Sequence, residues 1–180
     1  MTGPPAPDRP FAVCFVCTGN ICRSPMADVV LRHLAEEQVL GDGSPLAGRL
    51  RVSSAGTGPW HEGEPMDPRA RHALAARGHT DHGHVARQIS RAQLERVDLV
   101  VGLTRRHAET LRSLVATSGR ADHVELTVLR RFDPGAGGAL DVPDPYYGGL
   151  AEFAECLSMI EPACRGLAQV LADRLTRTTA

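Results

Sequence analysis

The chain has 180 residues, of which 42% are apolar and 23% charged, so it has the size and composition of one globular α/β domain rather than of a disordered or fibrous protein. Its net charge of −1 provides no overall field for holding nucleic acid or an anionic membrane. No stretch approaches the ~20 apolar residues that span a bilayer, and the N-terminus lacks a signal-peptide pattern. We therefore expect a cytoplasmic protein without nucleic-acid or membrane partners.

The first half of the chain alternates between extended and helical patterns. Residues 1–10 contain four prolines and are expected to form a disordered tail, because proline sustains neither a helix nor a central strand. An uncharged apolar run predicts a buried strand at 11–16, and a second strand is expected at 50–54. Between them, Pro25 opens a predicted helix in which apolar residues recur at three- and four-residue spacing over 26–38.

The alternation continues to the end of the chain. Asp67 as cap, Pro68 as first residue and Gly78 as terminator predict the next helix. The remaining elements are expected as strands at 98–103 and 124–129 and helices at 105–117 and 150–175, with Pro162 as a candidate interruption.

Four strands separated by helices predict a single-domain, doubly wound, four-stranded parallel sheet with helices on both faces. The domain is expected to cover residues 11–176, followed by a short tail at 177–180. Ligands of such sheets bind beyond the carboxyl ends of the strands, which is where the segment 17–25 falls. The one long irregular segment, 130–149, has a length that is more often functional than not.

The segment C-T-G-N-I-C-R-S-P, from Cys17 to Pro25, has the composition of an N-terminal phosphate-binding loop. Five residues between Cys17 and Arg23 can form a tight turn, eased by Gly19, whose backbone N–H groups point toward a common centre at a helix N-terminus. Arg23 adds a planar fork that matches two phosphate oxygens. These positive surroundings favour the thiolate of Cys17, to which Ser24 can donate a hydrogen bond. The pattern thus indicates a sulfur nucleophile aimed at phosphorus.

The segment resembles the signature of the low-molecular-weight protein tyrosine phosphatases, which has a cysteine, five residues, an arginine and a serine near the N-terminus. Further segments match that family in the same order, over about residues 11–171. They are S-A-G-T at 54–57, W-H-x-G at 60–63, P-x-D-x-R-A at 65–70, H-V-A-R-Q-I at 84–89 and D-V-P-D-P-Y-Y-G at 141–148. The resemblance implies a hydrolase that removes phosphate from phosphotyrosine in proteins through a phosphocysteine intermediate, without metal or other cofactor.

The resemblance also implies a role for each matching residue. Cys17 would be the nucleophile, Arg23 would bind the phosphoryl group, and Asp144 would be the general acid and then the general base. An acid is needed because phenol, with a pKa near 10, is a poor leaving group as phenolate. The phosphate-binding loop would comprise Thr18, Gly19, Asn20, Ile21, Cys22, Arg23 and Ser24. Asn20, Ser24, Ser54 and His84 would support that loop, and the substrate slot would be lined by Trp60, Tyr146 and Tyr147.

Two positions depart from relatives of the same family. Relatives that act on phosphoarginine tend to carry threonine after the signature asparagine, whereas this chain has Ile21, which favours phosphotyrosine. Many relatives have Met-Asp where this chain has Leu103 and Thr104, so the acid of those relatives has no counterpart here.

The odd number of five cysteines argues against a disulfide framework and leaves room for a reactive thiol or a metal site. The C-F-V-C spacing could suggest a thioredoxin-like or zinc motif, but the redox motif normally starts a helix whereas this one ends a strand. We expect Cys14, Cys156 and Cys164 to be packed in the core. Cys22 is either a bystander or, as in relatives, the partner of Cys17 in a reversible disulfide.

Three other patterns in the sequence resemble a ligand site or offer a second acid. H-x-x-H-x-H at His79, His82 and His84 could coordinate a metal, but we expect the first two to be solvated and His84 to support the loop. The sequence G-A-G-G at 135–138 lacks a following helix and does not predict dinucleotide binding. Asp141 could rival Asp144 as the acid, but we expect it to shape the loop.

Two rival functions remain open. Arsenate reduction uses a similar anion loop, but with further cysteines on a mobile segment, and this chain has none between Cys22 and Cys156. A module that binds phosphotyrosine without cleaving it would not need an intact Cys17 and Asp144. We expect a monomer whose partners are tyrosine-phosphorylated proteins.

Overall fold

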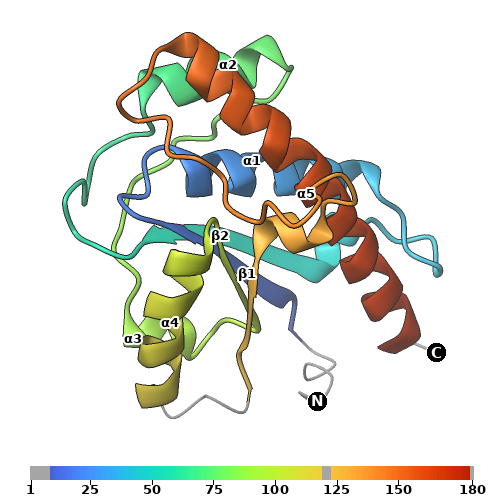
Figure 1. Cartoon of the computed structure of the whole chain (residues 1–180). Coiled ribbons are helices and arrows are strands. Elements are labelled where there is room, and N and C mark those ends of the chain that lie inside the picture. Colours follow the sequence, from blue (N-terminus) through green and yellow to red (C-terminus); the bar gives the residue numbers. More distant parts are fainter. Residues whose placement is uncertain (1–8, 119–122, 179–180) are drawn as a thin grey trace.

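The structure is a computed structural model that describes residues 9–118 and 123–178, and its centre is a sheet of four parallel strands (Figure 1). The strands are β1 (Phe11–Cys17), β2 (Leu50–Gly56), β3 (Leu99–Gly102) and β4 (Glu125–Val128), in the spatial order β2-β1-β3-β4. All seven residues of β1 are buried, because this strand has a neighbour on each edge and helices on both faces. The predicted strands are confirmed, with ends that differ by one or two residues.

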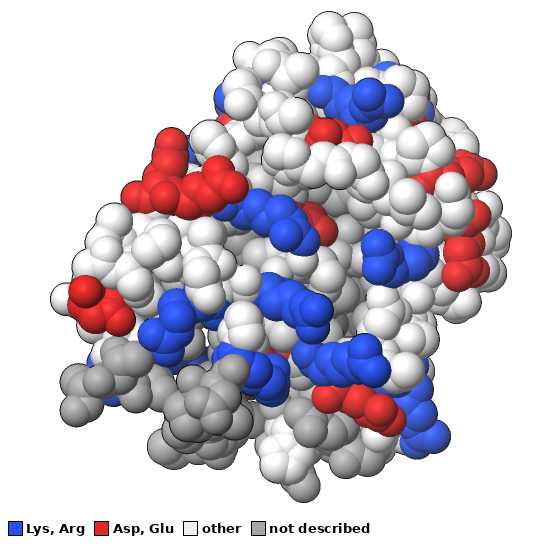
Figure 2. Space-filling model, turned by 180° about the vertical axis from the view of Figure 1, so that it is seen from behind, with Lys and Arg blue, Asp and Glu red and all other residues white. Residues whose placement is uncertain are grey.

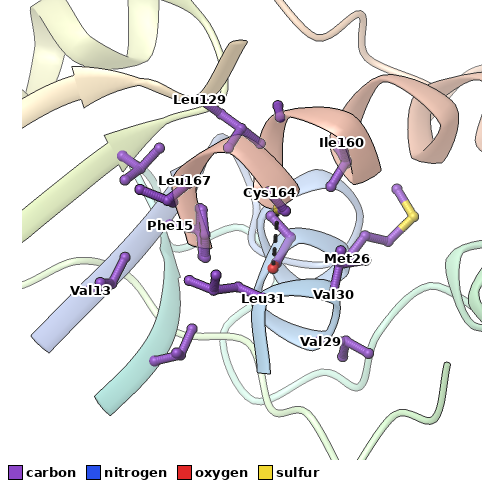
Figure 3. Packing of buried hydrophobic residues seen from close by; sticks show 14 of the residues in the cluster. Val13, Phe15, Met26, Val29, Val30, Leu31, Leu129, Ile160, Cys164 and Leu167 are labelled. Carbon is purple, nitrogen blue, oxygen red and sulfur yellow. Dashed lines mark hydrogen bonds between the residues drawn. The ribbon is translucent and has the colours of Figure 1, made fainter. Parts of the chain in front are cut away.

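Helices cover both faces of the sheet, as predicted for a doubly wound fold (Figure 1). One layer contains α1 (Arg23–Glu37), α2 (Pro68–Ala76) and α5 (Leu150–Thr178), and the other contains α3 (Arg91–Leu94) and α4 (Arg105–Thr117). The alternation of side chains along β1 divides the core between the two layers. Val13 and Phe15 pack with residues of α1 and α5 (Figure 3), whereas Cys14 and Val16 pack with residues of α4.

The helix boundaries follow local chemistry. The Asp67 side chain accepts a hydrogen bond from the Arg69 backbone N–H and caps α2, and Gly78 follows the helix with a φ of +78°, so both signals are confirmed. The helix α5 runs through Pro162 without a break, because the Ser158 carbonyl that loses its donor belongs to an exposed residue that water can reach.

The ends of the chain are described only in part. Residues 1–8 and 179–180 of the two expected tails lie outside the described residues. Arg9 forms an ion pair with Asp98 at 2.5 Å, and α5 includes Arg177 and Thr178, which were expected in the tail. The helix α3 and two 3-10 helices, η1 (Leu46–Arg49) and η2 (Leu129–Phe132), were not predicted, since four residues are too short to show a periodic pattern.

The topology gathers three segments at one edge of the sheet. Strand order reverses between β1 and β3, and a crevice at such a point lies beyond the carboxyl ends of both strands. The loop after β1, the start of α4 after β3 and the irregular segment after η2 all begin at this edge. Within the described ranges, no helix has both the length and the apolar character needed to cross a membrane.

Charged side chains are unevenly spread over the surface. On the face shown in Figure 2, basic side chains cross the middle and acidic side chains lie mainly around them. The basic residues are all arginine, because the sequence contains no lysine. The near-neutral net charge therefore describes the chain as a whole and not each of its faces, and the expected absence of a nucleic-acid partner stays a prediction.

Candidate active site

The loop from β1 to α1 is held in its curved form through Asn20. This residue has a φ of +59° and is the only non-glycine residue of the described chain in the left-handed region, where asparagine is tolerated better than most side chains. The Asn20 carbonyl accepts a hydrogen bond from His84 Nε2 at 2.6 Å, and its Oδ1 accepts one from the Arg87 backbone N–H at 3.0 Å. The loop is thus bonded to the neighbouring segment through Asn20, and the supporting roles of Asn20 and His84 stay predictions.

The same loop leaves its backbone donors free. The helix α1 has no side-chain cap, and the backbone N–H groups of residues 18–24 donate no hydrogen bond to the part of the chain that the structure describes. Unpaired N–H groups at a helix N-terminus favour an anion, both as donors and through the helix dipole. Gly56 makes room for this arrangement, because a Cβ atom there would lie 2.7 Å from the Thr18 carbonyl oxygen.

Cys17 and Ser24 form a buried pair at the base of the loop. The distance from Cys17 Sγ to Ser24 Oγ is 3.0 Å, and Ser24 Oγ accepts a hydrogen bond from Asn20 Nδ2 at 2.9 Å. Ser24 Oγ also lies 3.2 Å from the Ala55 carbonyl oxygen. The single hydroxyl hydrogen of Ser24 can be donated either to that carbonyl or to sulfur. A thiolate at Cys17 would accept a hydrogen bond from this hydroxyl.

Arg23 and Asp144 meet although 121 residues separate them in the sequence. Arg23 NH2 donates to Asp144 Oδ2 at 2.7 Å, and Arg23 NH1 donates to the Val142 carbonyl oxygen at 3.2 Å. The Arg23 side chain is only 6% exposed, whereas that of Asp144 is 46% exposed. The structure therefore brings a buried guanidinium and a half-exposed carboxylate, from segments far apart in the sequence, to the mouth of the cysteine loop.

A pocket of about 370 Å³ opens above these residues. Cys17 lies at its base with 2% of its surface exposed, and Trp60, Tyr146 and Tyr147 line its outer part, so their assignment to a substrate slot stays a prediction. His61 lines the same wall and was not predicted; its ring centroid lies 5.8 Å from that of Tyr146. The adjacent Trp60 in the W-H-x-G segment is the signal that could have identified it.

A larger hollow of about 680 Å³ lies between α1, β2 and the segment 78–87. It lacks the cysteine, the arginine and the acid of the predicted site. It shares with that site only the residues His84 and Arg87, which hold Asn20. The reactive groups therefore lie in the smaller of these two pockets.

The histidines of the H-x-x-H-x-H pattern differ in their burial and in their hydrogen-bond partners. His84 bonds to Asn20, and burial lowers its pKa, so the neutral ring donates through Nε2. The expectation that His79 is solvated was wrong: it is buried, lies 3.2 Å from Glu161 Oε1 and makes an edge contact with His33. Among the residues that the structure places, no group of three or more His, Cys, Asp or Glu side chains is arranged to hold a metal ion.

The other four cysteines are buried thiols. Burial raises the pKa of Cys14 and of Cys156 to about 12, and it raises the pKa of Cys22 and Cys164 as well. Cys14, Cys156 and Cys164 belong to the hydrophobic core, so that prediction is confirmed. All four remain protonated at neutral pH and are poor nucleophiles. The disulfide between Cys22 and Cys17 stays a prediction.

Of three further positions beside the loop, only Ser54 differs from expectation. Ser54 is buried, but its hydroxyl makes no hydrogen bond within the described residues; the carbonyl of its neighbour Ala55 contacts Ser24 instead. Thr104, where many relatives have an acid, caps α4 by accepting a hydrogen bond from the His107 backbone N–H at 3.1 Å. Asp141 shapes the loop as expected, because its Oδ1 accepts a hydrogen bond from the Arg105 backbone N–H at 2.7 Å.

Two further residues next to the site were not predicted. His107 Nε2 lies 3.0 Å from Thr18 Oγ1, and the position of His107 in the first turn after β3 is the signal that could have found it. Arg69 pairs with Asp67 at 2.7 Å and donates to the Gly148 carbonyl oxygen at 2.8 Å, so it ties α2 to the segment that carries Asp144. Arg69 belongs to the P-x-D-x-R-A segment.

Comparisons with known proteins place the chain among phosphatases. The family model described as low molecular weight phosphotyrosine protein phosphatase matches residues 12–177. A low molecular weight protein-tyrosine-phosphatase of Streptomyces coelicolor is 48% identical over 170 residues, which cover 92% of this chain and 96% of the relative. The crystal structure of YfkJ from Bacillus subtilis superposes with a TM-score of 0.76 at 31% identity, covering 93% of this chain and 98% of YfkJ. A Drosophila arginine phosphatase gives a TM-score of 0.77 at 26% identity, covering 88% and 96%.

Proposed function

The chain belongs to the family of low molecular weight phosphotyrosine protein phosphatases, and from this membership we propose that it hydrolyses phosphotyrosine in proteins through a phosphocysteine at Cys17. The observation that carries the proposal is the meeting of Cys17, Arg23 and Asp144 at one pocket, from segments 121 residues apart. A thiol, a guanidinium and a carboxyl group are the three groups that this reaction needs.

In the first step, the Cys17 thiolate attacks phosphorus while the bond from phosphorus to the tyrosine oxygen breaks. Asp144 donates a proton to that oxygen, so tyrosine leaves as a neutral phenol. For this to occur, Asp144 gives up its hydrogen bond to Arg23 and carries a proton, and phosphate oxygens take over the guanidinium. Arg23 and the free N–H groups of the loop stabilise the charge on the equatorial oxygens, which leaves no task for a metal ion in this scheme.

In the second step, Asp144 accepts a proton from water as the water oxygen attacks the phosphocysteine. The bond between phosphorus and sulfur breaks, inorganic phosphate forms, and Cys17 returns to the thiolate. Ser24, whose Oγ lies 3.0 Å from the sulfur, donates a hydrogen bond to the leaving thiolate and keeps its proton. Asp144 is thus the acid in the first step and the base in the second, and Cys17 is first the nucleophile and then the leaving group.

The shape of the pocket favours a long aromatic substrate side chain. Cys17 is 2% exposed, so only a long substrate side chain can bring its phosphate to the sulfur. The rings of Trp60, Tyr146 and Tyr147 line the outer part of the pocket. Aromatic rings pack well against one another, which suits a tyrosine ring. Phosphoarginine is the second candidate, because an arginine phosphatase shares the fold, but the apolar Ile21 in the loop favours phosphotyrosine.

Activity on matched peptides that carry phosphotyrosine or phosphoarginine, with and without a chelator, tests this assignment. We expect a kcat/KM for the phosphotyrosine peptide at least about tenfold above that for phosphoarginine, the discrimination that one changed pocket contact can supply, and no loss with chelator. Ile21→Thr should shift the ratio toward phosphoarginine, whereas Ile21→Val should leave it near that of the wild type. A preference for phosphoarginine, or loss of activity with chelator, would contradict the proposal.

The proposal also places the enzyme in the cytoplasm, as a monomer that acts on tyrosine-phosphorylated proteins. All five cysteines are free thiols, which suits a reducing compartment. The half-exposed Asp144 and the exposed rings of Trp60 and Tyr147 leave the mouth of the pocket open to a protein surface.

A further inference from the structure

A polar pair, Thr18 and His107, lies directly beside the phosphate-binding arginine and has no place in the scheme above. We propose that this pair is a clamp that sets the orientation of the Arg23 guanidinium, so that phosphate affinity and turnover both depend on it. The inference rests on the proposed function, because it takes Arg23 as the ligand of the phosphoryl group. Thr18 and His107 are thus positioning residues and not catalytic ones.

The clamp joins three elements of the fold. His107 Nε2 lies 3.0 Å from Thr18 Oγ1, and Arg23 NH2 donates to the same oxygen at 3.3 Å. Thr18 follows β1, Arg23 is the first residue of α1, and His107 is in the first turn of α4. Thr104, the cap of α4, holds the His107 backbone N–H at 3.1 Å and so fixes the turn from which the imidazole reaches the loop.

The protons of the clamp can be assigned from donor and acceptor chemistry. A guanidinium only donates, so Thr18 Oγ1 accepts from Arg23 and keeps one hydrogen of its own to donate. His107 Nε2 accepts that hydrogen when the ring is neutral and carries its proton on Nδ1. Burial, followed by the charge of Arg23, lowers the pKa of His107 to about 4, so the ring is neutral at physiological pH.

Burying this polar pair costs free energy of folding. His107 is 6% exposed, and its Nδ1 has no hydrogen-bond partner among the residues that the structure describes. An apolar side chain would fill such a place without leaving a polar atom unsatisfied. The imidazole makes its one side-chain hydrogen bond to Thr18, which contacts Arg23. Thr18 therefore links the His107 imidazole to the Arg23 guanidinium.

The clamp defines which donors of Arg23 remain for phosphate. Arg23 NH2 lies between Thr18 Oγ1 and Asp144 Oδ2, and Arg23 NH1 is held by the Val142 carbonyl oxygen. Arg23 Nε is buried and has no partner in the described chain. When Asp144 withdraws to act as acid, Thr18 is the contact that keeps NH2 in place. Without it, the planar fork loses one of its fixed points and binds the phosphoryl oxygens less well.

A double-mutant cycle tests the clamp in the full-length enzyme. The variants are Thr18→Val, which keeps the shape of the side chain but removes the hydroxyl, His107→Phe, and the two combined. The measured quantities are the inhibition constant of inorganic phosphate, the kcat/KM for p-nitrophenyl phosphate and the Tm. We expect each single variant to weaken phosphate binding and to lower kcat/KM by about tenfold, the size of one hydrogen bond to a charged group. The double variant should be no worse than Thr18→Val alone.

Controls separate positioning from stability. Thr18→Ser retains the hydroxyl and should restore phosphate binding close to that of the wild type, and His72→Phe makes the same change at an exposed position of α2 and should have no effect. A purely structural role would lower the Tm while leaving the phosphate inhibition constant unchanged. Where His107→Phe does not fold, Thr18→Val and Thr18→Ser alone still decide the matter.

The outcomes are distinguishable from those of the proposed function. Losses of phosphate affinity that add in the double variant, or an unchanged inhibition constant in Thr18→Val, would overturn the clamp while the enzyme remains a phosphatase. A wild-type protein that neither hydrolyses aryl phosphates nor binds inorganic phosphate would overturn the proposed function instead.

Discussion

Replacing Cys17 by serine is expected to reduce turnover of an aryl phosphate to background, a loss on the order of 10⁶-fold, as when a covalent enzyme loses its nucleophile. The serine hydroxyl is far less nucleophilic than a thiolate at neutral pH, while Arg23 and the loop N–H groups are unchanged. Inorganic phosphate or vanadate should therefore still bind. Steady-state kinetics and isothermal titration on the same preparation measure the two effects separately.

The matched control for this variant is Cys14→Ser. Cys14 is buried in the same strand, three residues before Cys17, but it faces the core on the α4 side, where burial raises its pKa to about 12. The same atomic change there should lower the Tm, because it buries a hydroxyl, and should leave kcat near that of the wild type. Residual activity of Cys17→Ser near that of the wild type would remove Cys17 from the role of nucleophile.

Replacing Asp144 by alanine is expected to slow phenyl phosphate by about 10²- to 10⁴-fold, the contribution of a general acid. A substrate with a more acidic phenol, such as p-nitrophenyl phosphate, needs less protonation of its leaving group and should be slowed much less. The dependence of log(kcat/KM) on the pKa of the leaving phenol should therefore become steeper. A series of substituted phenyl phosphates measures this slope.

The loss of the Asp144 carboxylate also removes a partner of Arg23, so the comparison needs variants that separate the two effects. Asp144→Asn keeps an oxygen that can accept from Arg23 but cannot act as an acid, and it should show the same steep slope. Asp141→Ala removes a carboxylate from the same segment that bonds to Arg105, and it should leave the slope unchanged. Equal slowing of all substrates by Asp144→Ala would exclude Asp144 as the acid.

Local chemistry explains why much of the fold could be predicted. The strand β1 is an apolar run, α2 has a cap and a glycine terminator, and α4 starts and ends at the predicted residues because its apolar positions repeat with helical period. The exceptions are equally local. Three four-residue helices were too short to show a pattern, and Pro162 did not end α5 because the Ser158 carbonyl that loses its donor belongs to an exposed residue.

The site was predictable where its residues lie in one motif and not where the fold brings distant residues together. Cys17, Arg23 and Ser24 lie within eight residues, so their spacing reveals the loop. The contacts of His107 with Thr18 and of His79 with Glu161 span 89 and 82 residues, and no spacing rule connects them. Ser54 is the converse case, because its type and position match the family but its hydroxyl does not make the expected hydrogen bond among the described residues.

The contact between Arg23 and Asp144 has a consequence for the order of events. The same guanidinium nitrogen serves the acid in the structure and the phosphoryl group in the proposed reaction. In the proposed reaction, substrate binding to Arg23 therefore displaces Asp144 in a single exchange.

Trapping the intermediate tests the central claim most directly. Asp144→Ala, mixed with p-nitrophenyl phosphate, should form the phosphoenzyme readily but hydrolyse it slowly, because no general base activates the water. After a rapid denaturing quench and proteolysis, mass spectrometry should find one phosphoryl group, attached to Cys17, with an initial burst of p-nitrophenol of matching amount. A phosphoryl group on another residue, or turnover with no phosphorylated protein and no burst, would contradict the account.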